Sequence, residues 1–322
     1  MNDPSSSRLP VSRWMAIGAL LVVTVIWGGT FVWMKQALDA AVLELGAEHA
    51  NAGVALFMTL RFGLAAVCTA ALIPPSWKGL SRSVWTGGFW IGLVLFGGFV
   101  LQMLGLQEVT PSVSAFLTSL YVLFTAVLTA VLARRGPSRA LIAGVLLATL
   151  GAGFIRGRPE LGFNTGELLT VAGAVLFAAH ILLTDRVTKR EPPMPVTLAS
   201  FVWVTVGGCV MILPALFASE GPGLAALVRL ATRPGFAVPL VLSSLLATVL
   251  ALSLMNVFQR RLDPVRAAIL YAFEPIWAAL FGIAAGTDRF TTYLWLGGAL
   301  LLAGNLIAEL GQRFGREAPA RT

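Results

Sequence analysis

The segment LDPVRAAILYAFEPIWAALFGIAAG, residues 262–286, is apolar and long enough to cross a lipid bilayer. Glu274 lies in its middle and is followed at once by Pro275. A carboxylate near the bilayer midplane costs at least ~2.5 kcal/mol. A proline inside a helix removes a backbone hydrogen bond and can kink the helix. Two such penalties side by side indicate that this helix carries a functional site.

The composition around this segment is that of a membrane protein. Hydrophobic residues make up 57% of the 322 residues, charged residues make up 12%, and the mean hydropathy is +0.84. Soluble domains carry roughly twice that share of charge. The net charge of +8 fits basic cytoplasmic loops, so no nucleic-acid partner is expected. Cys68 and Cys209 lie in apolar segments, where packing is their expected role.

Apolar segments of bilayer-spanning length predict ten transmembrane helices. Lys and Arg gather in every segment on one predicted side, which places both termini, residues 1–12 and 313–322, in the cytoplasm. The predicted spans are about 14–34, 52–73, 84–106, 112–133, 140–156, 166–185, 196–218, 237–258, 264–286 and 291–311.

A shift of 153 residues aligns PSVSAFLTSLYVLFTAVLTAVL (111–132) with PVRAAILYAFEPIWAALFGIAA (264–285). The same shift places Gly144 on Gly297 and Gly151 on Gly304. These matches predict two five-helix repeats. Because five is odd, the second repeat must be inverted in the membrane, an arrangement typical of transporters with a site at the midplane. The repeats are residues 13–156 and 164–312; a chance likeness between apolar helices is the alternative.

The repeat extends to a stripe of polar residues around Glu274. Helical spacing puts Ala267, Tyr271, Glu274 and Ala278 on one face. The 153-residue shift gives each of these four residues a counterpart in the first repeat, and all four counterparts carry hydroxyl groups. We expect this face to line a cavity, with helix packing as the alternative. The counterparts are Ser114, Thr118, Tyr121 and Thr125.

Other polar residues within predicted helices have two open interpretations each. Arg61 either pairs with Glu274 or caps backbone carbonyls, or it holds an anionic substrate group. His180 either relays protons or binds substrate, or it packs with a hydrogen bond. Gln102 lines the path or bonds between helices. Trp27-Gly28-Gly29 is expected to interrupt the first helix and to serve as a hinge or a close-packing point, with Pro275 as a second hinge.

No catalytic constellation is visible in the sequence. It contains no G-x-x-x-x-G-K-[ST], H-E-x-x-H or G-x-S-x-G motif and no His/Cys cluster with metal-ligand spacing. With His49 and His180 as its two histidines, the chain is expected to hold no metal and no cofactor. The sequence therefore argues against an enzyme.

Five stretches in their order resemble the drug/metabolite transporter superfamily, and in particular its EamA-type permeases. The resemblance covers nearly the whole chain. It implies ten helices in two inverted repeats, secondary transport, and export of amino acids or other small metabolites across bacterial inner membranes. The family pattern matches Trp27, Gly28, Arg61, Tyr121, His180, Glu274 and Pro275. The stretches are IWGGTFVWMK (26–35), MTLRFGLAA (58–66), GLQEVTPSVSAFLTSLYVLF (105–124), GELLTVAGAVLFAAHILLTDR (166–186) and FQRRLDPVRAAILYAFEPIWAALFG (258–282).

The expected function is secondary transport of a small metabolite such as an amino acid by alternating access, with export as the expected direction. Its expected partners are the small-molecule substrate, membrane lipid and protons carried by Glu274; the oligomeric state stays open. A membrane-embedded enzyme or lipid-handling protein is the alternative, and a non-transporting structural membrane protein is a third.

Overall fold

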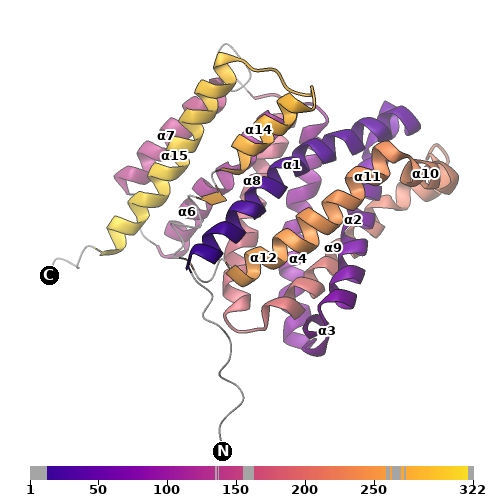
Figure 1. The fold of residues 1–322 in the computed structure, drawn as a ribbon, viewed down its shortest axis with the longest axis horizontal. Helices are drawn as coiled ribbons and strands as arrows, with labels where there is room; N and C mark the ends of the chain where they lie inside the picture. Colours follow the sequence, from indigo (N-terminus) through magenta and orange to yellow (C-terminus); the bar gives the residue numbers. More distant parts are fainter. Residues whose placement is uncertain are drawn as a thin grey trace, which may run out of the picture.

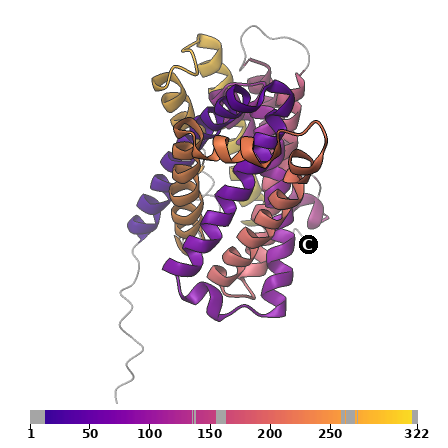
Figure 2. The same ribbon diagram turned by 90° about the vertical axis from the view of Figure 1, so that its right-hand side faces the viewer.

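The computed structural model describes residues 13–134, 136, 138–154, 163–258, 262, 270–271 and 273–317. These residues form a bundle of helices and contain no strand (Figures 1 and 2). Both predicted tails, apart from residues 313–317, and the segment 263–269 with Pro264 and Ala267 lie outside the described residues.

In the first half of the chain, polar residues mark where helices begin. The Ser81 side chain accepts a hydrogen bond from Val84 N at the start of the helix that begins at Arg82. The side chain of Thr110, which precedes Pro111, accepts one from Val113 N at the start of the next helix. The predicted fourth span is divided at Ser119. The elements are α1 (Arg13–Leu45), η1 (Ala47–His49), α2 (Ala50–Leu72), α3 (Pro75–Lys78), α4 (Arg82–Leu106), α5 (Pro111–Thr118), α6 (Leu120–Leu132) and α7 (Arg139–Phe154).

The second half opens on a capping box, in which Asn164 and Glu167 each accept a hydrogen bond from the other's backbone N–H. Its predicted span 237–258 contains a π-helix, labelled η2, between two α-helices. The elements are α8 (Thr165–Thr188), α9 (Pro193–Phe217), α10 (Gly223–Thr232), α11 (Pro234–Leu242), η2 (Ser243–Leu250), α12 (Ala251–Phe258), α14 (Glu274–Ala284) and α15 (Thr292–Glu317).

Seven helical segments of the described chain are long and apolar enough to cross a membrane, which makes this a multi-pass membrane protein. The three remaining predicted spans coincide with shorter apolar helices at Arg139–Ala152, Glu274–Ala284 and Thr292–Ala308. Residues 155–162 and 263–269, within or beside two of these spans, lie outside the described residues, and the third helix, α15, continues to Glu317. The count of ten spans therefore stays a prediction.

Helix α1 differs from its predicted form in two ways. It continues to Leu45, well beyond the expected end near Met34. It also runs unbroken through Gly28 and Gly29, so the expected interruption is wrong. A Cβ at Gly28 would lie 2.5 Å from Trp277 Cβ, which shows that this glycine lets α1 and α14 approach closely.

Pro275 is likewise not in a helix interior. It occupies the first turn of α14, which begins at Glu274. The first N–H groups of a helix have no intrahelical acceptor, so a proline costs no hydrogen bond there. The proline thus helps to start the helix that presents Glu274, and the expected kink of the span at Pro275 stays a prediction, because residues 263–269 and 272 lie outside the described residues.

Helices α7 and α15 form a close pair at one side of the bundle (Figure 1). A Cβ at Gly144 would lie 2.6 Å from the Gly304 carbonyl oxygen, and one at Gly151 would lie 2.6 Å from the Gly297 carbonyl oxygen. Helix pairs in lipid pack most closely where such small residues meet. Elsewhere in the bundle, α4 packs against both α8 and α9, and α1 packs against α11, α12 and α14.

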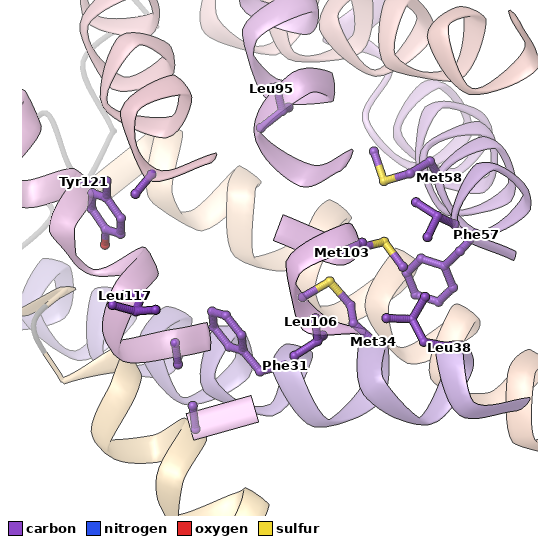
Figure 3. Close-up of a cluster of buried hydrophobic side chains, with 14 of the residues drawn as sticks. Phe31, Met34, Leu38, Phe57, Met58, Leu95, Met103, Leu106, Leu117 and Tyr121 are labelled. Atoms are coloured by element: carbon purple, nitrogen blue, oxygen red, sulfur yellow. The ribbon is translucent and has the colours of Figure 1, made fainter. Parts of the chain in front are cut away.

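The core between α1, α2 and α4 is built from large apolar side chains (Figure 3). Met34 and Leu38 of α1, Phe57 of α2, and Met103 and Leu106 of α4 come together there and are each at most 3% exposed. This dense packing fixes the helices that carry the polar residues of the site.

Candidate functional site

A cavity of about 100 Å³ lies at the centre of the bundle. Side chains from α1, α2, α4, α5, α6, α8, η2, α12 and α14 line it, together with Tyr271 just before α14. Most of the lining is apolar, and a few polar groups converge on it, as is usual for small-molecule sites. The lining residues are Trp27, Thr30, Phe31, Met34, Arg61, Leu95, Phe99, Gln102, Thr118, Tyr121, Phe177, His180, Ile181, Ala247, Leu252, Met255, Tyr271 and Glu274.

Glu274 and Tyr121 meet on this cavity. The Tyr121 hydroxyl donates to Glu274 Oε2 at 3.3 Å, and both residues are buried. The separation along the chain is 153 residues, the same as the repeat offset in the sequence. The Tyr271 ring lies 6.0 Å from the Trp27 ring, so an aromatic contact joins α1 to the residues just before α14.

Arg61 reaches the cavity from α2 and is 1% exposed. Its Nε donates to Thr248 Oγ1 at 2.9 Å, and its Nη1 lies 3.6 Å from Met34 Sδ. The guanidinium carbon lies 4.6 Å from the centre of the Phe99 ring. No ion pair of Arg61 within 4.0 Å occurs among the described residues. The expected pairing of Arg61 with Glu274 is therefore not present.

The π-helix η2 supplies two contacts of this site. Thr248 Oγ1 donates to the Ser243 carbonyl oxygen at 2.9 Å, five residues earlier, and accepts from Arg61. The Trp27 indole N–H donates to the Ala247 carbonyl oxygen at 3.1 Å. π-helical turns are rare and occur frequently at functional sites. Here the turn joins α1 and α2 to one segment of the cavity wall.

Two further polar contacts lie on the cavity. Gln102 Nε2 donates to Thr118 Oγ1 at 2.9 Å, and Gln102 Oε1 has no hydrogen-bond donor among the described residues. His180 Nε2 lies 3.5 Å from Thr184 Oγ1, one helical turn further along α8. The cavity thus presents a cation, a carboxyl group, an amide, an imidazole and hydroxyls to one small volume.

All but one of the sequence-predicted binding residues lie on this cavity: Trp27, Arg61, Gln102, Thr118, Tyr121, His180, Tyr271 and Glu274 do. Ser114 does not; it is buried in α5, and its Oγ has no partner among the described residues. Thr125 turns its hydroxyl to the Tyr121 carbonyl oxygen instead. Ser114 and Thr118 both lie in α5, one turn apart, so the cavity reaches only the end of α5 that leads to Ser119.

Sequence reasoning missed most of the apolar wall. Thr30, Phe31 and Met34 follow Trp27 at helical spacing, and Phe99 and Leu95 precede Gln102 in the same way. Counting three, four and seven residues along the helix from each predicted polar residue would have identified these neighbours. Thr248 and Ala247 had no comparable pattern, because the π-turn changes the spacing of that face.

No cluster of three or more His, Cys, Asp or Glu residues able to hold a metal ion occurs in the described part of the chain. The fold and the cavity together define a multi-pass α-helical membrane protein with a central cavity.

Residues 14–157 and 164–309 each match the EamA-like transporter family, so the chain belongs to this family of the drug/metabolite transporter superfamily. It is thus a transporter and not an enzyme. An uncharacterized transporter from Archaeoglobus fulgidus is 28% identical over 300 residues, which cover 93% of this chain and 87% of the relative. A solved crystal structure of a protein matches with a TM-score of 0.57 at 22% identity, and the match covers 92% of this chain and 99% of that one. This match shows a similarity of fold.

Proposed function

We propose that this protein is a secondary transporter that exports a small metabolite, such as an amino acid, by alternating access across a bacterial inner membrane. The observation that carries the proposal is the contact between Tyr121 and Glu274 on the central cavity. The repeat offset relates these two positions. Two positions that a two-fold axis exchanges touch each other only when they lie close to that axis. The cavity would then lie where the two repeats meet, which is where transporters of this architecture bind substrate.

The glycine contacts between α7 and α15 support the same symmetry. The 153-residue shift turns Gly144 into Gly297 and Gly151 into Gly304. It therefore exchanges the Gly144–Gly304 contact with the Gly151–Gly297 contact, and both contacts are present. This pattern favours two inverted five-helix repeats, residues 13–156 and 164–312, over a chance likeness. An inverted pair of five-helix units gives ten spans and places both termini on one side, the cytoplasm by the charge of the loops.

Glu274 is the group that we assign to proton coupling. Its carboxyl group lies on the cavity with the Tyr121 hydroxyl, while Tyr271, Arg61 and His180 face the same space. Such a carboxyl group can take up a proton when the cavity opens to one side and release it to the other. Alternating access then links solute movement to proton movement.

The test uses the full chain reconstituted in vesicles with an imposed pH gradient and radiolabelled amino acids as probes. The wild-type protein is expected to accumulate at least one of them in response to the gradient. Glu274→Gln keeps the size and hydrogen-bonding shape but cannot carry the proton. It should lose gradient-driven accumulation and keep exchange of labelled for unlabelled solute.

The matched control is Glu48→Gln, since Glu48 is an exposed carboxylate outside the cavity. It should transport as the wild type does. Proton coupling through Glu274 is refuted if Glu274→Gln accumulates solute at the wild-type rate with unchanged dependence on pH.

A further inference from the structure

Arg61 is a buried cation whose contacts orient it without neutralising it. Nε donates to a hydroxyl, Nη1 to a thioether, and the guanidinium lies against the Phe99 and Phe62 rings. Nη2 donates to no acceptor among the described residues, and Arg61 lines the central cavity. Nε and Nη1 are thus held, and Nη2 has no protein acceptor in the described part of the chain.

Such a cation is costly unless an anion joins it. Removing a charge from water in a protein interior costs several kcal/mol unless a partner and hydrogen bonds compensate. Aromatic faces and one hydroxyl return only part of this. Glu274 lies on the same cavity but forms no ion pair with Arg61. A ligand anion on the cavity side of the guanidinium would supply the missing partner.

We propose that Arg61 is the anion-binding group of the cavity, so that the solute presents a carboxylate to Arg61 and buries a compact apolar body. This inference rests on the proposed function in assigning the cavity to the transported solute. The geometry suits it, because a guanidinium presents parallel N–H groups to a carboxylate. The apolar body would contact Phe99, Leu95, Phe177, Ile181 and Met255, which line the same volume.

Thr248 is the positioning residue of this site. Its hydroxyl hydrogen goes to the Ser243 carbonyl oxygen, which leaves an oxygen lone pair for Arg61 Nε. The π-turn of η2 therefore fixes the direction of the guanidinium plane through one hydroxyl. Without that hydroxyl, Nε–H would lose its acceptor and compete with Nη2 for the ligand.

The test measures binding to the full chain in lipid nanodiscs by calorimetry, with empty nanodiscs as the control for partition into lipid. Three probes share one branched apolar body: 4-methylpentanoate, 4-methylpentanamide and 4-methylpentylammonium. Hydrogen bonds to a charged group are worth more than neutral ones. The carboxylate is therefore expected to bind roughly 10-fold to 100-fold more tightly than the amide, and the ammonium ion more weakly than either.

Two sets of variants locate this preference. Arg61→Gln should bring the affinities for carboxylate and amide to within about two-fold, by loss of the charge-assisted bond. Thr248→Val should reduce the preference, and Thr248→Ser, which keeps the hydroxyl, should restore it. Arg82→Gln, the same change at an exposed position, should leave it at the wild-type value.

The proposal is overturned if the wild type binds the amide or the ammonium ion as tightly as the carboxylate, or if folded Arg61→Gln keeps the preference. Should Arg61→Gln fail to fold, an unchanged preference in Thr248→Val overturns the orienting role that the structure gives to the hydroxyl and, with it, the proposed site. Binding needs no transport, so a protein that binds in this way and moves no solute in vesicles would refute the proposed function alone.

Discussion

Gly28→Ala tests whether the close approach of α1 and α14 builds the site. The added Cβ would lie 2.5 Å from Trp277 Cβ and 2.9 Å from the Ala278 backbone nitrogen. Carbon atoms prefer separations of about 3.5–4.0 Å, so the two helices must move apart by about 1 Å. Such overpacking costs about 1–3 kcal/mol. The movement would also separate Trp27 from Tyr271 and so widen the cavity beside Glu274.

Gly18→Ala is the matched control, because it lies on the same helix and an added Cβ there meets nothing within 4 Å. Both variants gain the same helix propensity, so the difference between them isolates the clash. At roughly 2–4 °C per kcal/mol, Gly28→Ala should unfold about 2–12 °C below Gly18→Ala. Thermal unfolding followed by size-exclusion chromatography measures this, and vesicle transport should fall in parallel. Equal unfolding temperatures for the two variants would refute the packing argument.

Two predictions concern the rest of the bundle. Gly144→Leu should separate α7 from α15 and lower the unfolding temperature. Gly136→Leu, where an added Cβ meets open space, should leave the unfolding temperature unchanged. Equal shifts in the two variants would show that the glycine contact is not a close one. Glu44 bonds both Arg229 at 3.0 Å and Arg233 at 2.5 Å, and so ties the end of α1 to α10 and the start of α11. Because both arginine side chains are more than half exposed, Glu44→Gln should cost at most about 1 kcal/mol per pair. The loss should be measurable as a lower unfolding temperature at low salt and vanish in 1 M NaCl; an equal loss at high salt would contradict a purely ionic tie.

The residues of the site were open to sequence reasoning where chemistry made them conspicuous. Glu274, Arg61 and His180 stand out because charged or titratable groups are costly inside a membrane. Tyr121 was identified because the repeat aligns it with Glu274. Ser114 was misplaced because the stripe was extended one helical turn beyond Thr118, where α5 is buried away from the cavity.

The contacts between these residues could not be read from the sequence. Arg61 finds its acceptor at Thr248, 187 residues away, through a π-turn that obeys neither 3.6-residue nor two-residue spacing. Gly28 was expected to interrupt the first helix or to be a close-packing point; that it admits Trp277 depends on where α14 packs. Pro275 was expected inside one long helix, and it lies in the first turn of α14.

The sequence by itself determined the class of protein, since apolar length and the cost of buried charge act within single segments. It also determined which residues are conspicuous, and it predicted a correspondence between the two halves. Only the tertiary structure decided which of these groups share one cavity, and that Arg61 stands there without an ion pair among the described residues. Which of these side chains contact each other depends on how helices far apart in the sequence pack. The local sequence pattern does not encode that packing.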